Sequence, residues 1–106
     1  MQKILLTVVL LLLTFVGIHT ADARTVTMNV SAYTWTGNVM ANGEYPYEGV
    51  VASDDLPLGT KVKVNGRIYV VKDRFGGGYT NRLDIYVDSY QRAINFGRQY
   101  LHVEIL

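Results

Sequence analysis

The sequence predicts a mainly β fold: a small six-stranded barrel with one short helix, preceded by an N-terminal signal peptide. Three observations support this prediction. Apolar and polar residues alternate with a period of two in several short segments, as they do in strands with one buried face. Asn65-Gly66 stands between two such segments, and Asn-Gly is a strong short-range signal of a β-hairpin. Residues 24–106 contain no cysteine, so the core alone must stabilise them, which favours a closed sheet with few exposed edges.

Residues 1–23 have the pattern of a secretory signal peptide. Lys3 supplies a positive start, residues 4–18 are almost wholly apolar, and Ala21-Asp22-Ala23 is a small-x-small cleavage signal before Arg24. The alternative is a retained membrane anchor, but the apolar run is shorter than the roughly 20 residues that a spanning helix needs. We therefore expect an exported domain of residues 24–106, with no stable membrane insertion after cleavage.

The expected strands follow in order along this domain. Residues 25–32 alternate strictly and form the first strand. Residues 33–49 are punctuated by glycine, asparagine and proline and predict a loop. A short strand over 49–53 precedes a turn, and residues 61–64 and 67–71 form the hairpin around the Asn-Gly turn.

A further strand, a helix and a last strand complete the prediction. In the strand that begins at residue 82, Leu83, Ile85 and Val87 form the apolar face, and Arg82, Asp84 and Tyr86 point the other way. The helix is expected to begin at Asp88 as N-cap, with Gln91 completing a capping box, and to end at Gly97. Its expected buried side is Ala93, Ile94 and Phe96. Residues 100–106 alternate again and form the final strand.

The composition excludes several kinds of chemistry. The net charge of +1 produces no field that points to nucleic acid or to a membrane surface. Without cysteine there is no thiol nucleophile and no thiolate metal site. His102 is the single histidine of residues 24–106, so a histidine-rich zinc site is excluded and a Ser-His-Asp triad would have to use this residue. We expect a monomer without metal or cofactor.

Asp84 is the strongest candidate for chemistry. It lies within a predicted strand, where aspartate is disfavoured because its side chain competes for backbone hydrogen bonds. Such a placement is often explained by function. Asp73 ends the preceding strand and Asp54 begins a turn, and aspartate suits both positions without any functional role.

The glycine-rich stretch from Phe75 to Tyr79 separates Asp73 from Asp84. It does not match a phosphate-binding loop, because no Lys-Ser/Thr follows and no helix begins there. The simpler interpretation is a loop that needs positive φ angles or close backbone approach. Aromatic residues near Tyr33 could stack on sugar rings, although β propensity and core filling explain most tyrosines of a β protein.

Several segments, taken in order, resemble a known family. They are Ala52-Ser53-Asp54, Leu56-Pro57-Leu58-Gly59-Thr60-Lys61-Val62, Val71-Lys72-Asp73, Gly76-Gly77, Asn81-Arg82-Leu83-Asp84-Ile85-Tyr86, Asp88-Ser89, Ala93 and Phe96-Gly97-Arg98. This pattern resembles the 3D domain, a double-psi β-barrel named for three aspartates and found in cell-wall proteins. The domain is shared with membrane-bound lytic transglycosylase A and is more distantly similar to rare lipoprotein A, barwin and expansins. The resemblance runs from about residue 30 to residue 106.

The resemblance implies a secreted or periplasmic, cell-wall-associated enzyme. Its partner would be the glycan strand of peptidoglycan, cleaved between N-acetylmuramic acid and N-acetylglucosamine by lytic transglycosylation. Asp84 would be the catalytic acid. Asp73 and Asp54 would be the other two aspartates of the catalytic site and would line the same cleft. Like charges and partial burial would raise the pKa of Asp84, as an acid needs near neutral pH. The expected substrate-binding residues are Tyr33, Gly76, Gly77, Tyr79 and Arg82.

The sequence departs from the family pattern in loops that contact substrate. Tyr79 replaces a usual lysine, Met40-Ala41-Asn42-Gly43 replaces Thr-Ala-Ser-Gly, and residues 52–57 form a shorter segment than usual. These differences keep two alternatives open: a non-catalytic expansin-like or glycan-binding module, and a hydrolase that uses water.

Overall fold

The computed structural model describes residues 23–106, so the predicted signal peptide lies outside the described residues. The described chain forms six strands and one short helix. In order these are β1 (Arg24–Tyr33), β2 (Val50–Ala52), β3 (Lys61–Val64), β4 (Arg67–Asp73), β5 (Arg82–Tyr86), α2 (Tyr90–Phe96) and β6 (Arg98–Ile105). None of the helices in the described part of the chain is long and apolar enough to span a membrane.

The strands close into a barrel, as the sequence predicts. Around the barrel the order is β1, β5, β2, β4, β3 and β6. The pairs β1–β5 and β2–β4 are parallel, and the other neighbouring strands are antiparallel. Closure removes the exposed edges that a sheet of this size would otherwise present to other chains. The prediction of a mainly β fold with a six-stranded barrel and one short helix is therefore confirmed.

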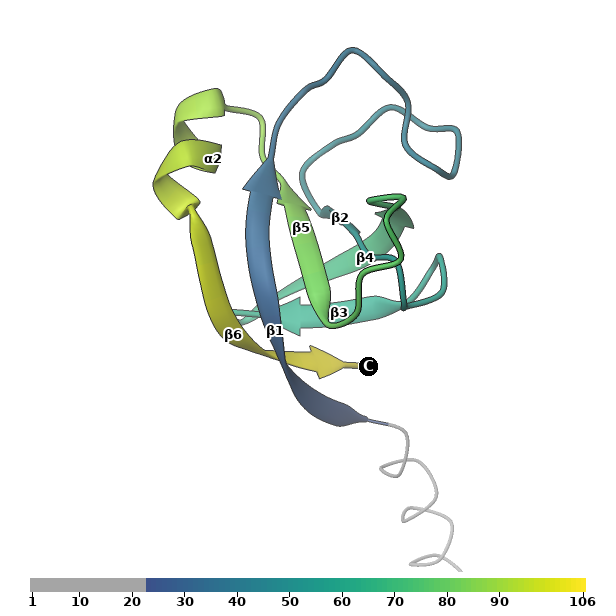
Figure 1. The fold of residues 1–106 in the computed structure, drawn as a ribbon, viewed down its shortest axis with the longest axis vertical. Helices are drawn as coiled ribbons and strands as arrows, with labels where there is room; N and C mark the ends of the chain where they lie inside the picture. The colour runs from purple at the N-terminus through teal and green to yellow at the C-terminus, as the bar shows by residue number, and fades with distance from the viewer. Residues whose placement is uncertain (1–22) are drawn as a thin grey trace, which may run out of the picture.

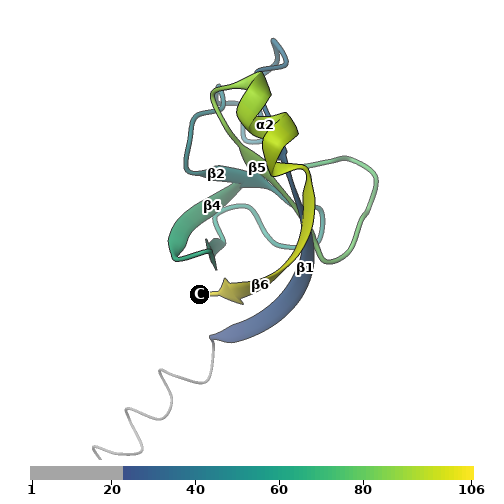
Figure 2. The same cartoon turned by 90° about the vertical axis from the view of Figure 1, so that its left-hand side faces the viewer.

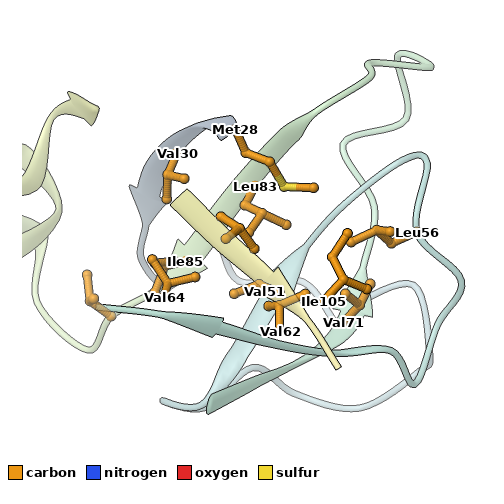
Figure 3. Packing of buried hydrophobic residues seen from close by; sticks show 12 residues of the cluster. Met28, Val30, Val51, Leu56, Val62, Val64, Val71, Leu83, Ile85 and Ile105 are labelled. Atoms are coloured by element: carbon orange, nitrogen blue, oxygen red, sulfur yellow. The ribbon is translucent and has the colours of Figure 1, made fainter. Parts of the chain in front are cut away.

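The core fills the inside of the barrel with alternate residues of each strand (Figure 3). Met28, Val30, Leu83 and Val103 are almost completely buried and come from β1, β5 and β6. Truncation of such a side chain leaves a cavity and costs about 2–5 kcal/mol for Leu to Ala. Since the inward positions of β5 are apolar, its polar residues lie on the outer face of the barrel.

The predicted hairpin turn is confirmed. Asn65 and Gly66 connect β3 to β4 with φ angles of 51° and 80°. Both angles are positive, as a type I′ turn requires.

Two predictions about the helix are wrong. Ser89, not Asp88, is the N-cap: its backbone is extended, with φ −143° and ψ 129°, and its hydroxyl accepts a hydrogen bond from the N–H of Arg92. Asp88 lies one residue too early for a helix that begins at Tyr90. Ile94 is 56% exposed, because this short helix presents only Ala93 and Phe96 to the core.

The end of the helix is predicted correctly. Gly97 is the C-cap with φ 64°, and its N–H donates to the carbonyl of Ala93. In Figure 1 the helix lies at the end of the barrel where β1 and β5 finish.

The 34–49 loop covers the same end of the barrel (Figure 1). Met40 from this loop packs with Val50 and Tyr86 in a second buried cluster, and Tyr33 packs against it. The rings of Tyr33 and Tyr86 meet edge to face, with centroids 5.4 Å apart. Tyr86 points outward from β5, as predicted, but this loop buries it.

Candidate functional site

One row of residues crosses the outer face of four strands. Ser31 of β1 is paired with Asp84 of β5, Asp84 is also paired with Ala52 of β2, and Ala52 is paired with Asp73 of β4. Paired residues of neighbouring strands share a face of the sheet. Adjacent strands are about 4.8 Å apart, so the backbones of Asp84 and Asp73 are separated by about 10 Å.

A register shift places Asp73 in this row. The β2–β4 pairing runs from Val51 opposite Val71 directly to Ala52 opposite Asp73, so Lys72 is the extra residue. Such bulges re-aim side chains. Without the shift, Lys72 would stand opposite Ala52 and Asp73 would be displaced from the row.

Asp84 lies in a partly buried environment on this row. The hydroxyl of Ser31 donates a hydrogen bond of 2.9 Å to its Oδ1. Burial raises the pKa of Asp84, and the negative charge of Asp73 adds to the increase. The Ser31 hydrogen bond and the charges of Arg82 and Arg98 oppose this increase, but the net pKa remains above its usual value of 3.8. A raised pKa is what a carboxylic acid needs if it is to donate a proton near neutral pH.

Asp73 connects three segments of the chain. Its Oδ2 accepts a hydrogen bond of 3.0 Å from the Tyr33 hydroxyl. Its Oδ1 accepts from the N–H of Ala41 at 3.0 Å and from that of Arg74 at 2.8 Å. Burial and then the negative charge of Asp73 raise the pKa of Tyr33 well above its ordinary range, so this phenol remains protonated. Asp73 therefore attaches the 34–49 loop and β1 to the end of β4.

Asp54 faces the glycine-rich loop rather than the row. Its two carboxylate oxygens accept hydrogen bonds from four backbone N–H groups, those of Phe75, Gly76, Gly77 and Tyr79, at 2.8–3.1 Å. Desolvation pushes the pKa of Asp54 up, but these N–H groups outweigh it and the pKa lies below its usual value. The carboxylate thus holds the loop in shape, and the N–H groups of Gly76 and Gly77 are already occupied.

The neighbouring Asp55 strengthens the same attachment. Its Oδ2 accepts a hydrogen bond of 2.9 Å from the N–H of Asn81, where the loop returns to β5. Figure 2 shows the loop projecting from the barrel wall beside β1 and β5. Gly76 and Gly78 have φ angles of 90° and 70°, which confirms the predicted need for positive φ.

Arg82 stacks on two aromatic rings of this loop. Its guanidinium carbon lies 4.8 Å from the ring centroid of Phe75 and 4.4 Å from that of Tyr79. The two rings meet edge to face, 5.7 Å apart. A Cβ atom added at Gly77 would lie 2.5 Å from the Tyr79 ring, so this glycine allows the ring its close approach.

The structure brings some of the predicted residues together and separates others. Asp84, Asp73 and Tyr33 share one outer surface, whereas the carboxylate of Asp54 is turned into the loop. No pocket is found within residues 23–106. Groups of three or more histidine, cysteine or acidic side chains able to hold a metal are absent from the same residues.

Sequence reasoning missed two neighbours of Asp84. Ser31 and Arg98 approach it through the pairing of β1 with β5 and of β1 with β6. Alternation alone places Ser31 on the polar face of its strand, but it does not reveal which strand lies alongside.

Comparisons with known proteins add no family to this geometry. No family model matches the chain, and no curated protein matches it either. Functional interpretation therefore depends on the site itself and on the motif pattern in the sequence.

Proposed function

We propose that this protein is a secreted 3D-type double-psi barrel that cleaves peptidoglycan glycan strands between N-acetylmuramic acid and N-acetylglucosamine. Asp84 is the catalytic acid and base of a lytic transglycosylase. The observation that carries the proposal is the placement of Asp84: a partly buried carboxyl with a raised pKa, held by Ser31 on the outer face of a strand. Sites built on strands keep their geometry better than sites on loops.

In this mechanism protonated Asp84 donates its proton to the glycosidic oxygen as the bond to the muramic acid C1 breaks. The 6-hydroxyl of the same sugar then forms a new bond to C1. The Asp84 carboxylate takes the proton of that hydroxyl and is ready for another cycle. One carboxylate serves both steps and no water is consumed, in contrast to the paired carboxylates of most glycosidases.

Features outside the row support the same proposal. The parallel pairs β1–β5 and β2–β4 within a closed barrel agree with a double-psi arrangement. β1 begins at Arg24, directly after the predicted cleavage site, which agrees with export to the periplasm or the cell exterior. In this proposal the domain acts as a monomer on the glycan strand and needs no metal or cofactor.

The deciding experiment is digestion of purified peptidoglycan, with mass analysis of the products. Asp84→Asn should abolish the release of 1,6-anhydro-muropeptides while the fold is retained. Asp88→Asn is the matched control, because Asp88 is an exposed aspartate just beyond β5 and outside the row. Undiminished release by Asp84→Asn would contradict the assignment. Products heavier by one water would instead identify a hydrolase.

A second function is favoured by two exposed aromatic rings. Trp35 and Tyr45 are 52% and 67% exposed on the 34–49 loop, and their rings lie 5.7 Å apart. Exposed aromatic rings can stack on sugars, so a glycan-binding module without bond cleavage would use these two rings. Retention of the protein on insoluble peptidoglycan, with no soluble product from the wild type, would select this function.

A further inference from the structure

Two arginines flank Asp84 on the outer face of the barrel. Ser31 lies between Asp84 on β5 and Arg98 on β6, since it is paired with both. Arg82 precedes Asp84 by two residues on β5, so both side chains point to the same face. Both arginines are close enough for their charges to act on the Asp84 carboxyl. Positive charge therefore lies on two sides of the proposed acid.

Neither arginine forms an ion pair within residues 23–106. The two ion pairs of that region join Lys72 to Glu44 and Arg92 to Glu48. The carboxyl of Asp84 accepts its hydrogen bond from Ser31 and forms no ion pair with either arginine. Within residues 23–106, therefore, no carboxylate neutralises either guanidinium group in an ion pair.

The stacked rings hold the guanidinium of Arg82 in place. Phe75 and Tyr79 fix its guanidinium at 4.8 and 4.4 Å from their ring centroids. Its Nε is buried without a hydrogen-bond partner, as is Oδ1 of Asn29, the residue paired with it across β1 and β5. The residue as a whole is only partly buried, and Arg98 is exposed. A guanidinium that is already positioned loses little entropy when it binds a planar carboxylate.

We propose that Arg82 and Arg98 form a carboxylate-binding subsite beside Asp84, so that the ligand of this surface is an anionic glycan. That the carboxylate belongs to a glycan rests on the proposed function. Two parallel N–H groups of a guanidinium match the two oxygens of a carboxylate, and such charged hydrogen bonds are stronger than neutral ones. In peptidoglycan the carboxylate comes from the lactyl ether of muramic acid or from the attached peptide.

Calorimetric titration with three soluble probes tests this subsite. The probes are chitotetraose, which is neutral, a tetrasaccharide of alternating N-acetylglucosamine and N-acetylmuramic acid with free lactyl groups, and the same tetrasaccharide with its tetrapeptides attached. All measurements use the Asp84→Asn background, which prevents turnover. At least one anionic probe should bind about tenfold or more tightly than chitotetraose, as expected for a bidentate charged contact.

Arg82→Gln and Arg98→Gln should each remove most of that preference and leave the affinity for chitotetraose unchanged. Arg67→Gln is the matched control, because Arg67 is an exposed strand arginine that also stacks on a ring, that of Tyr69 at 5.3 Å. The probe that loses affinity identifies the source of the carboxylate. Amide spectra of each variant establish that the barrel is intact.

Three results would overturn the subsite: no preference for either anionic probe, equal losses for the neutral and anionic probes, or an equal loss with Arg67→Gln. These outcomes are separate from the fate of the proposed function. If anhydro-muropeptide release is observed without a carboxylate preference, only the subsite is wrong. If the preference is found without any release, the subsite stands and the catalytic proposal falls.

Discussion

The hydroxyl of Ser31 donates a 2.9 Å hydrogen bond to Oδ1 of Asp84 across the parallel pair β1–β5. This contact fixes the carboxyl on the outer face, and it also stabilises its ionised form. Burial and the Ser31 hydrogen bond therefore act on the pKa of Asp84 in opposite directions, and burial is the larger effect.

Ser31→Ala should raise the pKa of Asp84 further, because it removes a hydrogen bond that favours the charged form. If Asp84 acts as the proposed acid, the alkaline limb of the pH–activity profile should move to higher pH, since that limb would report loss of the protonated acid. The free energy of unfolding should fall by only about 1 kcal/mol, the usual net value of one hydrogen bond. Carboxyl-carbon NMR titration measures the pKa directly.

Thr27→Ala is the control for this change, since Thr27 is an exposed hydroxyl residue of the same strand whose partner is His102. It should leave the Asp84 titration where it is in the wild type. A lowered or unchanged pKa in Ser31→Ala would contradict the role given to this hydroxyl.

Asp84→Asn should make the protein more stable than the wild type at neutral pH. The folded-state pKa of Asp84 is raised, so between its usual value of 3.8 and the folded value the native state binds more protons than the unfolded state. The contribution of Asp84 to wild-type stability must then fall as the pH rises through this window, and it stays reduced above it. Asparagine resembles the protonated acid and does not ionise, so the variant does not lose this contribution to stability as the pH rises. Urea unfolding at several pH values should show a difference that vanishes as the pH falls below 3.8; a constant difference would contradict it.

Asp54→Asn should loosen the glycine-rich loop without unfolding the barrel. An amide offers one acceptor oxygen and places an N–H₂ donor against the other backbone N–H groups that the carboxylate now binds. Amide hydrogen exchange at Phe75, Gly76, Gly77 and Tyr79 should lose its protection, while core amides such as that of Val71 keep theirs.

Asp55→Asn is the matched control, because Asp55 accepts a single backbone N–H, that of Asn81. In Asp55→Asn, the loss of exchange protection should be confined to the N–H of Asn81. The pH dependence adds a second check: the folded pKa of Asp54 is lowered, so its contribution to stability is present above the unfolded pKa and is lost as the pH falls through the folded one. Equal exchange in both variants would show that the carboxylate does not hold the loop.

Much of the barrel could be predicted from local pattern. Alternation identifies the strands and their inner faces, and the Asn65-Gly66 turn identifies the hairpin, because period and turn chemistry are local properties. The N-cap was misplaced by one residue because Asp88 and Ser89 are both capping residue types, and only the observed backbone angles distinguish them.

The candidate site was harder to predict because pairing between distant strands builds it. Ser31 and Asp84 are 53 residues apart in sequence, and the register shift that brings Asp73 opposite Ala52 has no clear sequence signal. The sequence predicts a turn that begins at Asp54, where the chain bends, but the backbone groups that bind its carboxylate lie 21 to 25 residues further along the chain. Which face a residue occupies could be predicted, and which neighbour it meets there could not.

Gly77→Ala tests whether the stacked position of Arg82 depends on this glycine. The added Cβ would lie 2.5 Å from the Tyr79 ring, so the ring must move away and its contact with the Arg82 guanidinium must weaken. Gly77 is exposed and Tyr79 is 46% exposed, so the ring can turn aside and the cost should be close to that of a partly exposed cation–π contact, about 0.5–1 kcal/mol. Because the clash is with a side chain and not with backbone, the barrel itself should remain intact.

In a Tyr79→Ala background the Gly77→Ala substitution meets no ring, and its cost in unfolding free energy should nearly disappear. The difference between the two backgrounds, measured by urea unfolding, is the coupling energy of the pair. Equal costs in both backgrounds would mean that residue 77 acts through the backbone of the loop, and that the stacking of Arg82 does not depend on it.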